Sequence, residues 1–341
     1  MKKLLLSVLV LFSGTLSISA ATIKITNTSG LGVYDTPIDN LQTQVNSSND
    51  LSFLGNNTDF ATAMGDSTQF QTSTATFNGY QNYKLFAVSI GYGAGVVIPD
   101  TTDTAELEDK LKADGDIKAG AASAVTLNAG INLGLFVDNL YANILLGGFP
   151  ETEVYDGLRM KQLILGFGLN YSVIDSVSLL GGFAKWRGLS IGSGLYYINS
   201  KSSYSFETGE QTTSIGSFDV KVNPLVSFES DISIFKIPVE AVTSLQALWL
   251  LNFGFGAGAD LSFGKSNFDI NAKSDVYETA TNTKVGEAEL VGAGTEANPT
   301  LFKFKLLGSI GFNLGPVKID FPVVYYPADG LFMGVTTGFI F

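Results

Sequence analysis

The closing segment of the chain reads Gly330-Leu331-Phe332-Met333-Gly334-Val335-Thr336-Thr337-Gly338-Phe339-Ile340-Phe341, and its side chains alternate in character. The residues that share the side of Phe341 are Leu331, Met333, Val335 and Phe339. The other side carries mostly small residues. Because successive side chains of a strand point to opposite faces, the alternation predicts a β-strand with one apolar face.

The two ends of the chain point to the same compartment. Lys2 and Lys3 precede an apolar run from Leu4 to Phe12, and small residues follow up to Ala21. This pattern predicts a secretory signal peptide over residues 1–21, cut near Ala20 or Ala21. The terminal Phe341 on an alternating strand resembles the signal by which the barrel-assembly machinery recognises bacterial outer-membrane proteins. We therefore expect the chain in the bacterial outer membrane, with outer-membrane lipids around it and that machinery as a partner during biogenesis.

The composition favours a membrane barrel over a soluble domain. Apolar residues make up 45% of the 341 residues and charged residues only 15%, where a soluble domain has about 25%. After the signal, no apolar run approaches the ~18 residues that a membrane helix needs. Besides the membrane helix, the closed β-barrel is the other structure in which every backbone N–H and C=O group can form a hydrogen bond within lipid. Its lumen and interfaces also suit the 38 Gly and 25 Phe of this chain.

Several chemistries are excluded by residue counts. The chain has no Cys and no His, so disulfides, thiolate sites, Ser-His-Asp catalysis and most zinc sites are ruled out. The net charge of -12 makes nucleic acid a poor partner. We therefore expect no enzyme activity, no catalytic residues, no cofactor and no metal.

The region 81–341 repeats the alternating pattern of the closing strand. Apolar residues alternate with Gly, Asn, Ser or Thr in the stretches 84–98, 125–137, 140–146, 162–173, 251–263, 302–312 and 317–325. Further strands are expected near 177–184, 188–206, 212–229, 233–245 and 265–277. Apolar-out, small-or-polar-in alternation is what a transmembrane barrel strand requires. The fold class is therefore all-β, a transmembrane antiparallel barrel of about twelve to fourteen strands.

Residues 22–80 differ from the barrel and are rich in Asn, Thr, Ser, Gln and Gly. Thr36-Pro37 followed by Asp39 predicts the start of a short helix, and a second helix is expected over 59–70. Such short helices need a surface to pack on. We expect this segment to be an N-terminal, partly helical plug in the lumen; a periplasmic position is the alternative.

Loop lengths orient the predicted barrel. The short turns at 138–139, 175–176 and 314–315 should be periplasmic, and the long polar loops at 99–118, 200–215 and 276–299 should face outside. The loop 99–118 is acidic. A loop exposed to solvent accounts for this acidic character, and a divalent-cation site is the more specific alternative.

Three prolines, Pro224, Pro238 and Pro322, fall in expected strands. A proline removes one ladder donor, so each marks either a bulge or strand end or a wall break through which an apolar solute could leave sideways.

Inward charges are few and of mixed sign. Lys303 and Lys305 share the inner face of one expected strand, with Glu240 and Asp260 on others. These charges either form ion pairs that hold a plug or the wall, or leave a lysine for an anionic head group. Lys185-Trp186-Arg187 is the densest cationic and aromatic cluster. It suits an interface girdle with cation–π packing, or the rim of a ligand groove formed by Trp186 and Arg187.

The layout resembles the FadL-like family of outer-membrane transporters for long-chain fatty acids and other hydrophobic compounds. The segments that read like its strands are Trp186-Arg187-Gly188-Leu189-Ser190-Ile191-Gly192-Ser193-Gly194 and Phe253-Gly254-Phe255-Gly256-Ala257-Gly258-Ala259-Asp260. The plug motif Asn-Pro-Ala of that family is absent from 22–80. The resemblance implies a lumen plug and passive transport of a hydrophobic small-molecule ligand. A general porin and a surface-exposed interaction protein such as an adhesin are the alternatives.

Overall fold

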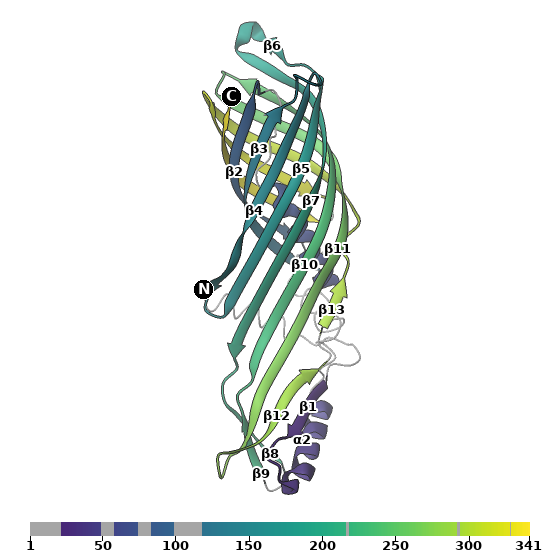
Figure 1. The fold of residues 1–341 in the computed structure, drawn as a ribbon, viewed down its shortest axis with the longest axis vertical. Coiled ribbons are helices and arrows are strands. Elements are labelled where there is room, and N and C mark those ends of the chain that lie inside the picture. The colour runs from purple at the N-terminus through teal and green to yellow at the C-terminus, as the bar shows by residue number, and fades with distance from the viewer. Residues whose placement is uncertain are drawn as a thin grey trace.

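The computed structural model describes residues 22–48, 58–73, 83–98, 118–215, 218–291, 294–327 and 329–341 (Figure 1). The predicted signal peptide, the acidic loop over 99–117 and the central part of 22–80 lie outside the described residues. No helix in the described part of the chain is long and apolar enough to cross a membrane.

Ten antiparallel strands close into a ring, which confirms the predicted barrel. In spatial order the ring is β11-β10-β7-β5-β4-β3-β2-β16-β15-β14, and a β11–β14 pairing closes it. The strands are β2 (Phe86–Val97), β3 (Gly120–Asn132), β4 (Leu140–Tyr155), β5 (Leu158–Ile174), β7 (Ala184–Glu207), β10 (Leu225–Ala247), β11 (Leu251–Glu278), β14 (Phe302–Leu314), β15 (Val317–Tyr326) and β16 (Gly330–Ile340).

The strand count of twelve to fourteen was too high. The sequence suggested separate strands over 212–229 and 233–245, and again over 251–263 and 265–277. The structure has single strands there, because β10 runs for 23 residues and β11 for 28. A spanning strand needs only about 10 residues, so these strands continue well beyond the thickness of a bilayer.

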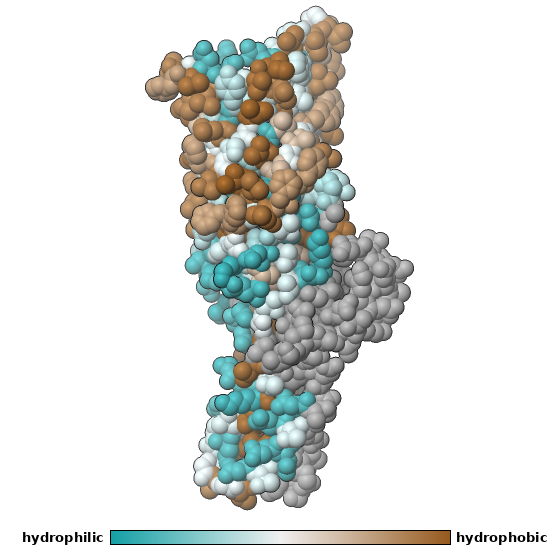
Figure 2. Space-filling view, turned by 90° about the vertical axis from the view of Figure 1, so that its right-hand side faces the viewer, coloured by the Kyte–Doolittle hydropathy of each residue, from teal (hydrophilic) through white to brown (hydrophobic). Residues whose placement is uncertain are grey.

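The alternation places apolar side chains on the outside of the ring. In β2, for example, every second residue is exposed, and these include Ile90, Tyr92 and Val96. The intervening small residues face inward and are buried. Figure 2 shows these exposed apolar side chains gathered into a band over one half of the molecule, with polar side chains below it. The apolar band is the surface that lipid would cover.

The two ends of the barrel differ. At one end, here the short-turn end, lie the tight turns 133–139 and 315–316, the strand β6 (Val177–Leu179), the short helix η4 (Leu180–Gly182) and Phe341 (Figure 1). The other end, the long-loop end, carries the continuations of β7, β10 and β11.

At the long-loop end these continuations build a small layer of their own, here called the extension. It adds β1 (Thr22–Asn27), α2 (Asp35–Ser48), β8 (Gln211–Ile215), β9 (Phe218–Val222), β12 (Thr283–Val291) and β13 (Gly294–Ala297), and η1 (Gly32–Tyr34) precedes α2 (Figure 1). Ile25, Ile38, Val220, Val276 and Val285 form its buried core.

Side-chain amides attach α2 to β1. The Asn46 Oδ1 accepts a hydrogen bond from the Ile23 backbone N–H at 2.9 Å, and its Nδ2 donates to the Ile23 carbonyl at 2.9 Å. Gln42 Oε1 accepts from the Ile25 N–H at 3.1 Å. Since β1 also pairs with β12, residues 22–48 belong to the extension.

The segment 58–73 has a different position. It forms α3 (Thr58–Gln69) and η3 (Phe70–Ser73), close to the predicted second helix. α3 contacts β2 and β3 on one side of the ring and β7, β10 and β11 on the other. The region 22–80 therefore divides into a part in the extension and a part among the inward faces of the barrel strands.

Candidate functional site

The fit between α3–η3 and the barrel wall defines the candidate site. The last residues of α3 and much of η3 are fully buried, including Asp66, Gln69 and Phe70. Glycines in the wall make the approach possible. A Cβ on Gly120 of β3 would lie 2.3 Å from the Ala63 carbonyl oxygen, and one on Gly95 of β2 would lie 2.6 Å from the Phe70 ring.

Asp66 is the centre of the first polar cluster. Its Oδ2 accepts hydrogen bonds from Lys303 Nζ and Thr300 Oγ1, both at 2.8 Å. Its Oδ1 accepts from the Thr300 backbone N–H at 2.8 Å and from Gln69 Nε2 at 3.1 Å. Lys303 also pairs with Asp329 at 3.0 Å. The carboxylate of the helix is therefore bonded to the wall on both oxygens.

Asp260 of β11 is the centre of the second cluster. It pairs with Lys236 at 2.8 Å and Lys305 at 2.6 Å, and it accepts a hydrogen bond from the Tyr326 hydroxyl at 2.8 Å. Lys305 pairs in addition with Glu240. This cluster belongs to the wall, and it supports η3 because Tyr326 stacks on Phe70 with ring centroids 4.3 Å apart.

Gln69 joins the second cluster to the helix. Its carbonyl oxygen accepts a hydrogen bond from Lys236 Nζ at 3.1 Å. Its Oε1 accepts one from Ser262 Oγ at 2.8 Å. The helix end is thus attached to β10 and β11 by a buried charge and a buried hydroxyl.

Lys303 and Lys305 face inward, as the alternation predicted, and each is about 1% exposed. Both ammonium groups bind two carboxylates of the chain itself. The predicted ion pairing of inward charges is therefore present. Their role toward an anionic head group stays a prediction, and in this arrangement their charges are already balanced.

Trp186 and Arg187 lie near the short-turn end, at the beginning of β7. The Trp186 indole N–H donates to Thr243 Oγ1 at 2.7 Å, and the Arg187 guanidinium donates to Gln246 Oε1 at 2.7 Å. Both partners are on β10. These two residues are therefore far along the barrel from Lys303 and the clusters around α3, and the structure does not bring them into one site.

The three prolines have two different positions. Pro224 lies between β9 and β10, outside the ring wall, so placing it inside a strand was wrong. Pro238 and Pro322 are within β10 and β15. The β10–β7 ladder has no pairing for residues 237–238, and the β15–β16 ladder has none for residues 321–322. Each proline thus interrupts the ladder on one side only.

Phe341 continues the barrel wall at the short-turn end. Its backbone N–H donates to the Phe86 carbonyl at 2.9 Å, and its ring stacks on Phe86 with centroids 4.8 Å apart. The terminal residue therefore joins the seam between the first and last strands of the ring.

An aromatic row, which was not predicted from the sequence, crosses the inner face of the extension. Tyr204 and Phe206 of β7 stack at 5.6 Å, Phe206 and Phe228 of β10 at 6.1 Å, and Phe228 and Phe268 of β11 at 6.3 Å. Phe268 then meets Phe60 of α3 edge-on at 4.8 Å. The four strand residues of the row are all even-numbered and face inward, so strand parity together with the correct length of β10 and β11 could have revealed that part of the row.

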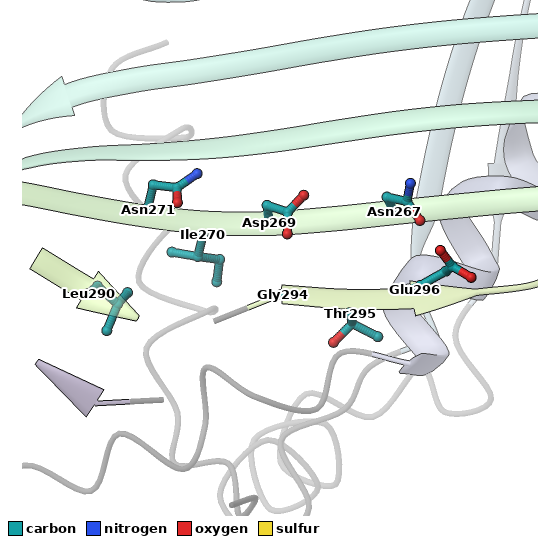
Figure 3. A pocket seen from close by; sticks show the side chains of 8 residues that line it. All are labelled: Asn267, Asp269, Ile270, Asn271, Leu290, Gly294, Thr295 and Glu296. Atoms are coloured by element: carbon teal, nitrogen blue, oxygen red, sulfur yellow. The ribbon is translucent and has the colours of Figure 1, made fainter. Parts of the chain in front are cut away.

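The outer face of the extension is polar and hollowed beside β11. One cavity of about 460 Å³ lies where β12 and β13 leave part of β11 uncovered, and Figure 3 shows Asn267, Asp269 and Glu296 at it. A second cavity of about 410 Å³ crosses β5, β7, β10 and β11 and shares Asn267 and Asp269 with the first. In the described part of the chain no group of three or more acidic side chains is arranged to hold a metal ion.

Comparison with known proteins gives a family. A family model described as Lsa36-like matches residues 18–341. No curated protein sequence is significantly similar to the chain.

Similar solved structures are barrels of distant sequence. The translocator domain of the autotransporter NalP from Neisseria meningitidis is 11% identical, with 76% of this chain and 90% of that chain covered and a TM-score of 0.31. The CymD monoaromatic hydrocarbon channel is 10% identical, with 76% and 90% covered and a TM-score of 0.26. A Pseudomonas aeruginosa FadL homologue is 7% identical, with 76% and 91% covered and a TM-score of 0.25.

Proposed function

The chain belongs to the Lsa36-like family, and because its strands form a closed barrel we propose that it is an outer-membrane transporter. Its cargo would be hydrophobic small molecules, such as long-chain fatty acids, moving by passive diffusion. The short-turn end would face the periplasm and the extension would face outward, because outer-membrane barrels have short periplasmic turns and longer external loops.

The observation that carries the proposal is the aromatic row. Four of its five rings line the inner face of the extension, and the fifth, Phe60, belongs to α3. The rings are half-buried, so part of each apolar surface stays available to a ligand. An apolar molecule that enters from outside would pack along this row and reach α3 at its end.

α3 and η3 would act as the plug. Buried ion pairs and hydrogen bonds at Asp66 and Gln69 hold them against the wall, so passage needs either displacement of this segment or an exit beside it. At Pro238 and Pro322 the wall ladder is interrupted on one side, which supports these positions as exit candidates.

Binding of a fluorescent fatty-acid probe to the full mature protein tests the proposal. Phe228→Ser should weaken binding by about 1–3 kcal/mol, the value of one buried apolar side chain. Phe235→Ser is the matched control, because Phe235 lies on the same strand but is 50% exposed on the outside of the barrel. If the intact protein binds no such probe, or both variants behave alike, the transporter proposal is wrong.

A surface interaction protein is the second candidate, and the extension favours it. The extension has its own core and reaches beyond the apolar band, where another macromolecule could contact it (Figure 2). This function would be favoured if cells carrying the barrel gain binding to another surface while the purified barrel binds no apolar probe. A porin is the less supported candidate, and large stable conductance from the intact protein would favour it.

A further inference from the structure

A group of charged residues lies on the outer face of the barrel, directly beside the apolar band. On β5, the outward residues Arg159 and Lys161 are followed by the exposed Leu163. On β10, the outward residues Glu229 and Asp231 are followed, after Ser233, by the exposed Phe235. The last charged residues before the apolar band, Lys161 and Asp231, lie in one cross-strand row, because both are opposite Lys201 of β7. That row is at the height where the headgroups of the lipid leaflet would lie.

The strand register places like charges opposite each other within this group. Lys161 of β5 is directly opposite Lys201 of β7, and Glu229 of β10 is directly opposite Asp269 of β11. Directly opposed like charges destabilise a sheet. Lys201 offsets part of this cost, because it pairs with Asp231 in the same row. A ligand of opposite charge at each pair would offset the rest, above all at Glu229 and Asp269.

The same strand register separates the basic side chains of this group from the acidic ones. Arg159, Ser203 and Glu229 form one cross-strand row, so a cation and an anion flank a small hydroxyl residue. Two strand spacings separate Arg159 from Glu229, about 10 Å at their Cα atoms. Within the described residues, Arg159 and Glu229 form no ion pair with each other, nor does Arg159 form one with Glu153, which faces it from β4. The cavity of about 410 Å³ covers this row.

We propose that this cavity binds a lipid headgroup that carries both a phosphate and an ammonium group, of the phosphoethanolamine class. Arg159 and Lys161 would bind the phosphate, since guanidinium and ammonium groups form strong charge-assisted hydrogen bonds to its oxygens. Glu229 and Asp269 would bind the ammonium group across Ser203. The acyl chains would then lie on the apolar band at Leu163 and Phe235. The inference needs only that the barrel spans a membrane and is independent of what the lumen carries.

Lipid retention by the full mature protein, measured by native mass spectrometry, tests this site. The protein is offered phosphatidylethanolamine and phosphatidylglycerol in equal amounts, and we expect it to retain the former preferentially. Arg159→Gln/Lys161→Gln should lower retention of phosphatidylethanolamine by more than about tenfold, because one charged hydrogen bond alone accounts for about tenfold and this variant removes two cations. Glu229→Gln/Asp269→Asn should abolish the preference between the two lipids. Lys221→Gln/Lys265→Gln, which removes two cations from outside the cavity, should change neither result.

Three results would overturn the proposal. One is equal retention of the two lipids by the wild-type protein. Another is unchanged retention by Arg159→Gln/Lys161→Gln when heat-modifiable migration shows that the variant is folded. The third is competition by millimolar glycerophosphoethanolamine that matches the intact lipid, which would identify a soluble headgroup rather than a membrane lipid as the ligand.

Discussion

Asp66 is the residue on which the position of α3 depends most. Its side chain is fully buried and receives one ammonium group, one hydroxyl, one amide side chain and one backbone N–H. Removal of one member of a buried ion pair costs more than the pair contributes, because the other charge stays buried without its partner.

Asp66→Asn should therefore destabilise the folded protein by about 3–5 kcal/mol. Glu289→Gln is the control, because Glu289 pairs with Lys273 at the surface, where the two side chains are 51% and 71% exposed. Its effect should be below about 1 kcal/mol. Thermal unfolding in detergent measures the loss of stability in both variants. Equal losses would show that the buried pair of Asp66 and Lys303 does not hold the helix.

Gly120 gives a second prediction at this scale. Gly120→Ala places a methyl group 2.3 Å from the Ala63 carbonyl oxygen, so α3 has to move. We expect higher conductance in planar bilayers and a loss of about 1–3 kcal/mol in stability.

Gly308→Ala is the matched control for that variant, since a Cβ at Gly308 meets nothing within 4 Å. If the Gly120→Ala variant has the conductance and the stability of the wild-type protein, α3 is not held close to β3.

The inward direction of Lys303 and Lys305 could be predicted from strand parity, because the side-chain period of a strand is two. Their partners could not be predicted. Asp66 is 237 residues away from Lys303 in sequence, and only the closed ring and the position of α3 bring the two together.

At the scale of elements, the long strands explain both the successes and the errors of the sequence analysis. Alternation identified the lipid-facing part of each strand, where the apolar signal is strong. It failed over residues 225–233 of β10 and beyond residue 265 of β11, because both faces carry polar residues there. Such a pattern is typical of a loop or of the start of a new strand. The predicted number of barrel strands was therefore too high.

The two wall prolines allow a prediction about local hydrogen exchange. The ladders are interrupted at residues 194–195 of β7 and 334–335 of β16. Because proline has no N–H, the carbonyl that faces Pro238 or Pro322 loses a donor and the wall opens more easily there. Amides at these interruptions should exchange about tenfold faster than amides in the continuous parts of the same ladders, the effect of one missing hydrogen bond. Exchange mass spectrometry with short peptides measures this, and uniform protection along both strands would contradict a weakened wall.

At the scale of the whole molecule, the orientation is the central expectation. Gly209 at the long-loop end and Gly181 at the short-turn end are matched insertion sites, because both have positive φ and open space around them. An epitope tag at Gly209 should be labelled on intact cells, whereas one at Gly181 should need permeabilised cells. The opposite pattern would reverse the proposed direction of the barrel.

The path of the N-terminal region has a consequence for biogenesis. β1 and α2 belong to the extension, α3 lies between the barrel walls, and β2 begins beside Phe341 at the opposite end (Figure 1). With the extension on the outside, as proposed, the segments 22–48 and 58–73 would have to cross the membrane before the β2–β16 seam closes, or thread through the ring in an unfolded form. A stable, quickly folding cargo domain fused ahead of Thr22 should consequently stall the chain in the periplasm, while an unstructured peptide of equal length should be exported with it.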